Sequence, residues 1–406
     1  MERPVNQTGA LKLGMPVKVM IAINDAWNIY NFSAGLIKSL LEKGYEVIAV
    51  APESEYAPRL QTLGCRFFPI PIECQGTNPG NDMLLLFRFI RMMRRERPDV
   101  FLGYTVKPNV YGSMAAKYLG IPAINTITGL GAAFTNDSFM TRIVKNLYSV
   151  SLRNSRKVFF QNEDDRHYFI ESGMSNPEVA DLLPGSGVDL DHFSRQAISS
   201  LTDGKRERFR FLLIARMLWD KGVGEYVEAA RMLRTKFPHV EFCLLGFLDV
   251  QNPAAISREQ IEAWVDEGTV NYLGVTDDVR PEIDNADCIV LPSYREGTPR
   301  TLLEAAAMAK PIIATDAVGC REVVEDQVTG LLCKLFDADD LARTMERLLE
   351  MSHEARLEMG SQGRAKVEEQ FDEQIVIEKY LDTINEVISP RTISPTDECR
   401  LWTPDK

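Results

Sequence analysis

Two carboxylates, Glu296 and Glu304, stand eight residues apart in the segment LPSYREGTPRTLLEAAAM. An apolar run that ends at Leu291 predicts a buried strand, and the next six residues, through Gly297, have the composition of a loop. Pro299 suits the first turn of a following helix, because that position needs no donor N–H and favours a helical φ. The carboxylates therefore flank the positive end of a helix dipole, which predicts a site for a ligand with both phosphate and hydroxyl groups.

A second candidate for anion binding is the segment ARMLWDKGVG at residues 215–224. Arg216 and Lys221 stand five residues apart in a loop that follows an apolar strand, so both cations can converge on one anionic group. Gly222 and Gly224 allow the backbone to approach a ligand closely. Taken alone, Arg216 and Lys221 could equally be solvated surface cations. The Glu-containing loop expected beside them in the same sheet favours a shared anion site.

The elements that must position these loops alternate between strands and helices. Apolar runs predict strands at 17–23, 45–51, 66–70, 99–103, 122–126 and 157–160, separated by amphipathic helices that include 30–43, 82–97, 109–119 and 139–154. A second series has strands at 209–215, 240–245, 270–273, 288–291 and 311–314, and its first helix is at 224–236. Alternation at this spacing predicts right-handed βαβ units and parallel sheets with helices on both faces.

We therefore expect an α/β fold of two doubly wound, Rossmann-like domains that face a cleft, because ligands of such sheets sit beyond the carboxyl ends of the strands. A length of 406 residues also exceeds one average core. The expected order is a disordered extension (1–15), an N-terminal domain (16–190), a linker (191–208), a C-terminal domain (209–370), a helix that crosses back to the N-terminal domain (371–389, in an amphipathic pattern from 368) and a tail (390–406).

Charge is uneven along the chain. The net charge is −12, and residues 1–200 hold 21 Lys+Arg and 19 Asp+Glu, against 25 and 39 in the remainder. This balance argues against nucleic-acid binding and directs any anionic partner to the N-terminal half. The first residues lack the basic-then-apolar order of a signal peptide, and no apolar run nears the roughly 18 residues of a membrane-spanning helix. We therefore expect a cytoplasmic protein.

Metal-binding patterns are weak. The seven cysteines form no C-x-x-C pair and have no histidine at metal-ligand spacing, which favours reduced, packed thiols. Two D-x-D triplets, Asp189 to Asp191 and Asp337 to Asp339, fall at the expected linker and at an expected helix N-terminus. We therefore predict neither a metal site nor a metal cofactor.

The segments ARMLWDKGVGEYVEA and SYREGTPRTLLEAAAMAKPIIATD together resemble the large retaining glycosyltransferase family 4, which uses nucleotide-sugar donors and has the two-domain GT-B fold. The resemblance covers nearly the whole chain, residues 17–387. It implies that Arg216 and Lys221 neutralise the donor diphosphate during catalysis. It also implies that Glu304 receives the ribose hydroxyls and that Glu296 faces the transferred sugar.

The same resemblance implies main-chain contacts to the donor, at the helix N-terminus and in two neighbouring loops. These residues are Gly297, Thr298, Pro299 and Arg300, with Gly246 and Val275 near the nucleotide base. Fixed cations and helix-end amides stabilise the charge that gathers on the leaving nucleoside diphosphate, so no metal is needed. Glycosidases also use paired carboxylates. Here, however, Glu304 is expected to face the nucleotide, which leaves Glu296 alone near the anomeric carbon and fits the front-face attack commonly proposed for this family.

The N-terminal domain departs from the family pattern. Many members place a histidine there against the donor sugar, whereas none of the four histidines of this chain lies at either expected strand end. Lys107 in GYTVKPN and the TGLG loop occupy those places, similar to a subgroup that extends polyprenyl-diphosphate-linked saccharides, often with N-acetylhexosamine. The expected sugar-contacting or acceptor-contacting residues are Asn24, Asn31, Lys107, Thr128, Gly129 and Gly131.

Two basic amphipathic helices predict contact with an anionic membrane surface. Their cations are Arg88, Arg91, Arg94, Arg95 and Arg97 in the first, and Arg142, Lys145, Arg153, Arg156 and Lys157 in and after the second. The alternative is that the apolar faces belong to the domain core and the cations are merely solvated.

Gly185 and Gly187, between the domains, are expected to form a hinge for cleft closure, with an ordinary turn as the alternative.

The expected activity is transfer of a sugar from a UDP-linked donor to a saccharide on polyprenyl diphosphate, in the synthesis of a cell-surface polysaccharide or glycan. The protein would act peripherally at the cytoplasmic face of the membrane. Two alternatives are a nucleotide-sugar epimerase or hydrolase of the same fold and a non-catalytic, donor-binding homologue. The intact set of Arg216, Lys221, Glu296 and Glu304 argues against the non-catalytic homologue.

Overall fold

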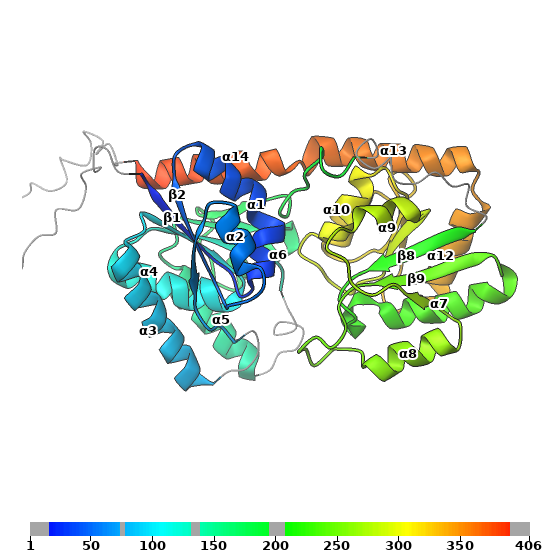
Figure 1. Ribbon diagram of the computed structural model, residues 1–406, viewed down its shortest axis with the longest axis horizontal. Coiled ribbons are helices and arrows are strands. Elements are labelled where there is room, and N and C mark those ends of the chain that lie inside the picture. The colour runs from blue at the N-terminus through cyan, green and yellow to red at the C-terminus, as the bar shows by residue number, and fades with distance from the viewer. Residues whose placement is uncertain (1–15, 74–77, 131–138, 195–207, 390–406) are drawn as a thin grey trace, which may run out of the picture.

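The computed structural model describes residues 16–73, 78–130, 139–194 and 208–389. Two α/β domains lie side by side along the longest axis of the molecule (Figure 1). The expected extension, most of the linker and the tail lie outside the described residues, as do Gly131, Cys74 and Cys399. Among the described helices, none is both long and apolar enough to cross a membrane.

The N-terminal domain is built on a seven-stranded parallel sheet in the order β3-β2-β1-β4-β5-β6-β7. Its strands are β1 (Lys18–Ala22), β2 (Glu46–Ala51), β3 (Arg66–Pro69), β4 (Val100–Tyr104), β5 (Ala123–Ile127), β6 (Lys157–Phe160) and β7 (Ala180–Leu182). The central strands are buried because they are continuous apolar runs covered by helices. The predicted series lacks β7, which has three residues at the sheet edge and is too short to show a pattern.

Helices cover both faces of this sheet. They are α1 (Ala26–Glu42), α2 (Ala57–Thr62), α3 (Pro79–Glu96), α4 (Ser113–Leu119), α5 (Phe139–Leu152) and α6 (Glu163–Glu171), with a π-helical turn at Pro108–Gly112 before α4. The prediction of a helix at 30–43 places its start too late, because α1 begins at Ala26. The chain enters α1 at Ala26 because the Asp25 carboxylate caps the helix, accepting a 2.9 Å hydrogen bond from Trp27 N. Asn31, a predicted sugar- or acceptor-contacting residue, lies within α1, where its Nδ2 donates to the Trp27 carbonyl.

The C-terminal domain has a six-stranded parallel sheet in the order β10-β9-β8-β11-β12-β13. Its strands are β8 (Phe209–Ile214), β9 (Val240–Leu245), β10 (Asn271–Tyr272), β11 (Cys288–Leu291), β12 (Ile312–Thr315) and β13 (Leu331–Cys333). Its helices are α7 (Val223–Lys236), α8 (Arg258–Asp266), α9 (Arg280–Asn285), α10 (Arg300–Ala307), α11 (Cys320–Val323) and α12 (Ala338–Glu350). The predicted fold of two doubly wound domains is confirmed.

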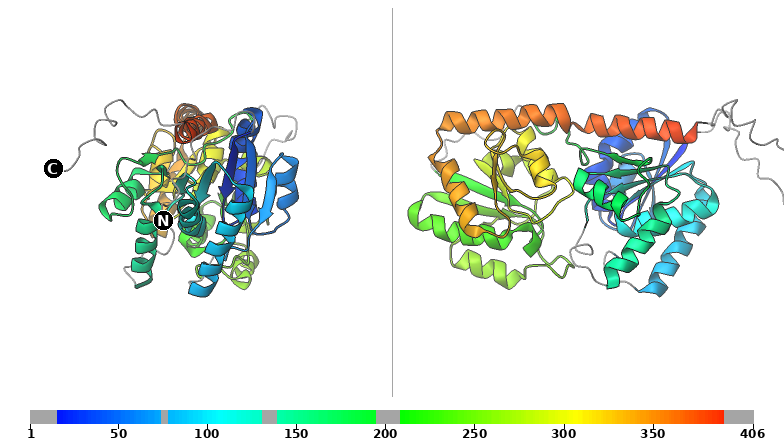
Figure 2. Two further views of the ribbon diagram at one scale, coloured as in Figure 1. Left: turned by 90° about the vertical axis from the view of Figure 1, so that its left-hand side faces the viewer. Right: turned by 180° about the vertical axis from the view of Figure 1, so that it is seen from behind.

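The last two helices, α13 (His353–Gln370) and α14 (Glu373–Ile388), run end to end along one edge of both domains (Figure 2). The prediction of a single helix from residue 368 is wrong, because α13 ends at Gln370 and α14 begins at Glu373. Val188 N donates a 2.9 Å hydrogen bond to the Phe371 carbonyl, and Glu373 N donates a 3.1 Å bond to the Val188 carbonyl. These bonds pair the two crossings between the domains and interrupt the helix.

Gly187 is required at this paired crossing. Its φ is +67°, and a Cβ there would lie 2.4 Å from the Glu373 Cα. Neither the left-handed backbone nor the close approach tolerates a side chain.

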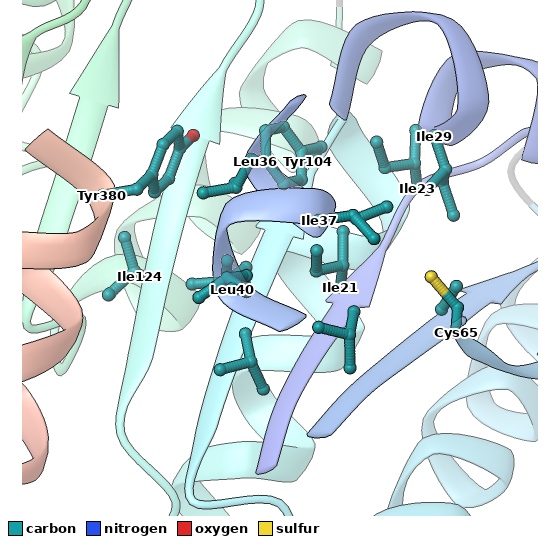
Figure 3. Packing of buried hydrophobic residues seen from close by; sticks show 14 of the residues in the cluster. Ile21, Ile23, Ile29, Leu36, Ile37, Leu40, Cys65, Tyr104, Ile124 and Tyr380 are labelled. Carbon is teal, nitrogen blue, oxygen red and sulfur yellow. The ribbon is translucent and has the colours of Figure 1, made fainter. Parts of the chain in front are cut away.

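Helix α14 belongs to the core of the N-terminal domain. It packs against α1, and Tyr380 lies among buried side chains of α1 and the central strands (Figure 3). The Tyr380 ring is 5.2 Å from the Phe159 ring and 6.1 Å from the Tyr104 ring. Its hydroxyl shares a hydrogen bond with Thr126 Oγ1, and burial raises the pKa of Tyr380 to about 12. The C-terminal segment is therefore anchored by an aromatic residue inside the first domain.

Replacing Tyr380 tests this anchor. We expect Tyr380→Ala to lower the free energy of unfolding by about 3–5 kcal/mol, because it removes a buried ring and leaves a cavity. Tyr380→Phe should cost only about 1 kcal/mol, the net contribution of one hydrogen bond. Urea unfolding followed by circular dichroism measures both. Ile375→Ala, at a more exposed position of α14, is the control, and an equal effect of Ile375→Ala and Tyr380→Ala would contradict the anchor.

Candidate active site

The two motifs singled out in the sequence follow adjacent strands, β8 and β11, which pair in parallel. After β8 the chain continues to β9, and after β11 it continues to β12 on the other side of the sheet. The two loops therefore diverge from neighbouring strand ends. Such a point of divergence opens a crevice at the carboxyl edge of a doubly wound sheet, where ligands bind.

Lys221 and Glu296 meet where these two loops diverge. The Lys221 Nζ lies 2.6 Å from the Glu296 Oε1, and only 16% and 15% of the two side chains is exposed. Gly222 makes the approach of the loops possible, because its φ is +70° and a Cβ would lie 2.0 Å from the Pro292 carbonyl oxygen. Tyr294 N also donates a 3.0 Å hydrogen bond to the Asp220 carbonyl. The structure thus brings the two motifs into direct contact.

Two more loops, after β9 and after β10, lie at this edge of the C-terminal sheet beside the β8 loop. Arg216 follows β8 with an exposed side chain. Gly246 follows β9 with φ +142°, and a Cβ there would lie 1.8 Å from the Ala215 carbonyl oxygen, so only glycine fits. Gly246 N donates a 2.9 Å hydrogen bond to the Gly274 carbonyl, next to the half-exposed Val275. These contacts hold together the loops in which donor-binding residues are predicted.

Glu304 lies in the second turn of α10 with its side chain 13% exposed. Arg300, at the start of the helix, reaches back so that its Nε lies 3.1 Å from the Glu304 Oε1. Burial raises the pKa of Glu304, and the Arg300 charge opposes that shift. The Arg300 Nη1 also donates a 3.3 Å hydrogen bond to Ser186 Oγ, at the crossing between the domains. Arg300 therefore links the Glu304 carboxylate to the crossing between the domains, a side-chain contact that the predicted main-chain role does not include.

The TGLG loop of the N-terminal domain touches the glutamate loop of the C-terminal domain. A Cβ on Gly297 would lie 2.4 Å from the Thr128 carbonyl oxygen, and a Cβ on Gly129 would lie 3.1 Å from Gly297 N. Pro299 directly precedes α10 as its N-cap, with φ −72° and ψ 112°. Two predicted sites from different domains therefore lie side by side.

Sequence reasoning misses three residues that follow β6 and contact the same loop. The Thr298 hydroxyl donates a 3.0 Å hydrogen bond to the Gln161 carbonyl. Asn162 Nδ2 donates to the Gly297 carbonyl at 3.2 Å, and Asp165 forms an ion pair with Arg295. The available signal is the polar run QNEDD directly after a predicted strand, at the edge that carries the other site loops.

Two other predicted acceptor-side residues, Lys107 and Asn24, have partners within the N-terminal domain. The Lys107 Nζ is engaged by Asp82 of α3 at 2.8 Å, and both side chains are largely buried. Asn24 follows β1, and its Oδ1 accepts a 3.5 Å hydrogen bond from Asn28 of α1. A sugar contact by Lys107 or Asn24 stays a prediction.

Both D-x-D triplets have structural partners. The Asp189 carboxylate accepts hydrogen bonds from the backbone N–H groups of Asp191 and His192, at 3.1 and 2.8 Å. Asp337 caps α12 by accepting a 2.8 Å hydrogen bond from Asp340 N. Within the described residues, no group of three or more His, Cys, Asp or Glu side chains could hold a metal ion. The cysteines described there, Cys65, Cys243, Cys288, Cys320 and Cys333, are buried free thiols.

Comparison with known protein families matches both domains. Residues 19–162 match the model of "Glycosyl transferase 4-like" domains, and residues 208–351 match "Glycosyl transferases group 1". A solved structure from Anabaena, a complex with UDP and glucose, superposes with a TM-score of 0.74 over 91% of this chain and 99% of that one, at 18% identity. That likeness shows a shared fold.

Two characterised relatives extend the comparison. An Escherichia coli UDP-Gal:α-D-GlcNAc-diphosphoundecaprenol α-1,3-galactosyltransferase is 24% identical, over 70% of this chain and 74% of its own length. A Campylobacter jejuni enzyme, N,N'-diacetylbacillosaminyl-diphospho-undecaprenol α-1,3-N-acetylgalactosaminyltransferase, is 30% identical over 89% of this chain and 96% of its own length. The chain therefore belongs to the family 4 (group 1) glycosyltransferases of GT-B fold.

Proposed function

We propose that this protein transfers an N-acetylhexosamine from a UDP-linked donor to a saccharide on polyprenyl diphosphate, with retention at the anomeric carbon and without a metal. The observation that carries the proposal is the Lys221–Glu296 pair at the β8/β11 crevice. The two transferases described above support the acceptor class, because both are named for sugar transfer to an undecaprenyl-diphosphate-linked saccharide. The UDP in the Anabaena complex and in the name of the E. coli enzyme supports the donor class.

The cations of the β8 loop suit the departure of a nucleoside diphosphate. As the glycosidic bond breaks, negative charge grows on the diphosphate, so a fixed cation stabilises the transition state more than the bound donor. Lys221 and the exposed Arg216 supply that charge. The first N–H groups of α10, an eight-residue helix, add donors and a positive dipole end at the same edge of the sheet.

The two glutamates have separate roles in this proposal. Glu304 is fixed in a helix with one oxygen held by Arg300, and we assign it to the ribose hydroxyls. Glu296 lies in the loop beside Lys221, and we assign it to the transferred sugar. With one carboxylate for the sugar, the route that fits is front-face attack, in which the leaving diphosphate takes the proton of the acceptor hydroxyl.

Membrane docking is the remaining part of the proposal. Helices α3 and α5 extend together from one end of the N-terminal domain (Figure 1). The first half of α3 exposes large apolar side chains, namely Met83 (53%), Leu84 (46%) and Phe87 (59%). Arg91, Arg94 and Arg95 follow on its exposed surface. This order suits a peripheral protein on the anionic cytoplasmic leaflet, where its lipid-linked acceptor would lie. Lys157 does not belong to this surface set, because its Nζ pairs with Asp181 at 2.9 Å.

Removing the Lys221 ammonium tests the phosphate role. Lys221→Ala should lower kcat/KM by about 10²-fold or more, as loss of a preorganised charge partner does in other enzymes. Lys236→Ala removes an exposed lysine of the same domain and should leave kcat/KM unchanged. Transfer is measured with radiolabelled UDP-N-acetylhexosamine and a synthetic polyprenyl-diphosphate saccharide. A Lys221→Ala protein with near-normal kcat/KM would refute the assignment.

Product analysis tests the reaction class. We expect turnover to require the lipid-linked acceptor, to survive excess EDTA, and to give a product whose new linkage keeps the anomeric configuration of the donor by NMR. Rapid consumption of UDP-sugar without acceptor would identify an epimerase or hydrolase instead. An inverted linkage would exclude front-face attack, and loss of activity in EDTA would exclude the metal-free mechanism.

Charge reversal on α3 tests membrane docking. Arg91→Glu/Arg94→Glu should abolish co-sedimentation with vesicles that contain anionic lipid, since each basic residue near such a surface contributes about 1 kcal/mol. Arg343→Glu/Arg347→Glu makes the same charge change on exposed residues of α12 and should bind vesicles like the unmodified protein. Equal vesicle binding by all three proteins would remove α3 from the proposal.

A further inference from the structure

On one side, the glutamate loop (residues 295–298) is held by residues of its own domain. Glu296 N donates a 2.9 Å hydrogen bond to the Val318 carbonyl. Gly319 packs so closely against the loop, at φ +89°, that a Cβ would lie 2.5 Å from the Glu296 carbonyl oxygen. These contacts include a hydrogen-bond partner for the Glu296 N–H. The side-chain donor to the carbonyls of Glu296 and Gly297 comes from elsewhere.

That donor belongs to the N-terminal domain. Asn162, with its side chain 3% exposed, is the N-cap of α6, because its Oδ1 accepts a 2.8 Å hydrogen bond from Asp165 N. Since the oxygen of the amide is used by the cap, its Nδ2 serves as the donor, and one of its contacts is with Asp165 Oδ2 at 3.2 Å. That Nδ2 lies 3.2 Å from the Gly297 carbonyl oxygen and 3.4 Å from that of Glu296. One side chain thus caps a helix in one domain and holds the glutamate loop of the other.

Asp165 adds a charged contact between the same two segments. Its side chain is fully buried, and its ion-pair partner, Arg295, directly precedes Glu296. A buried carboxylate is costly unless it is paired, and here the pairing cation belongs to the opposite domain. Separation of the domains would break the pair and expose Asp165 to water. The contact is therefore satisfied when the cleft is closed.

We propose that Asn162 and Asp165 are positioning residues that set the glutamate loop, and with it Glu296, when the two domains close. They act through the backbone of residues 296–297 and through Arg295. This inference rests on the proposed role of Glu296 at the transferred sugar. It also makes the N-terminal domain part of the catalytic geometry, because a loop of the donor-binding domain is ordered by the domain that receives the acceptor.

Asn162→Ser separates positioning from folding. A serine caps a helix as well as asparagine does, but it is too short to donate to the carbonyls of Glu296 and Gly297. We expect kcat to fall about tenfold or more, while the protein stays folded and the Kd for UDP stays unchanged.

Asp164 provides the matched control. It is the neighbour of Asp165 on α6 and also faces a cation of the C-terminal domain, but its side chain is half exposed and lies 3.9 Å from Arg321. Asp164→Asn should leave kcat unchanged, whereas Asp165→Asn should lower it. If Asp165→Asn fails to fold, Arg295→Gln tests the same pair from its more exposed side.

A scattering measurement separates this inference from the proposed function. UDP should compact the unmodified protein in small-angle X-ray scattering, and Asn162→Ser and Arg295→Gln should weaken that compaction, whatever the acceptor is. Normal kcat and normal compaction in both variants would overturn the positioning role while leaving the transferase proposal intact. The opposite pattern, weakened compaction in a protein that transfers no sugar, would overturn the proposed function alone.

Discussion

The candidate site depends on one backbone approach, that of Gly222 to the Pro292 carbonyl. A Cβ at residue 222 would lie 2.0 Å from that oxygen, so any other residue would push the β8 loop away from the β11 loop. The Lys221–Glu296 contact at 2.6 Å is the direct result, because its partners flank this approach on the two loops. The parallel pairing of β8 and β11 places the loops at one edge, and glycine brings them into contact.

The paired crossing at Val188 and Phe371 imposes a second constraint. Both connections between the domains pass through one point, joined by two backbone hydrogen bonds. If it serves as the expected hinge, this point would let the domains rotate without breaking either core, because α13 packs on the second domain and α14 on the first. Arg300 lies beside this crossing, with hydrogen bonds to Ser186 and Glu304. A ligand bound by Glu304 would therefore be connected to the crossing through the Arg300 side chain.

Much of the fold follows from local patterns, because buried parallel strands are continuous apolar runs and helices of this fold are amphipathic. The helix boundaries and strands that were predicted wrongly or missed depend on side-chain caps, on contacts between distant parts of the chain, or on very short segments. The start of α1 depends on the Asp25 cap, which the apolar periodicity does not show. The break before α14 combines a local cause, the Asp372 cap that accepts a 3.0 Å hydrogen bond from Gln374 N, with a distant one, the two backbone bonds to Val188. The edge strands β7 and β13 are three residues long and carry no period.

The site residues also divide into some that can be predicted from the sequence and others that cannot. Arg216, Lys221, Glu296 and Glu304 can be found from sequence because residue type, spacing and position after a strand all point to phosphate and hydroxyl recognition. For Asn162 and Asp165 only the position after a strand is a signal, since a capping asparagine and a first-turn aspartate are ordinary residue types at any helix start. Their importance arises only when another domain lies against them.

The Lys221–Glu296 pair also explains how a cationic site can exist before the donor binds. A largely buried lysine alone would carry an uncompensated desolvation cost, which the adjacent carboxylate offsets. In the proposed function, an entering diphosphate would bring acceptor oxygens for the same ammonium, and Glu296 would be freed to hydrogen-bond a sugar hydroxyl. Donor binding would then exchange one partner of Lys221 for another rather than create a new charge in the cleft. The carboxylate that stabilises the cation before binding would become the group that recognises the sugar afterwards.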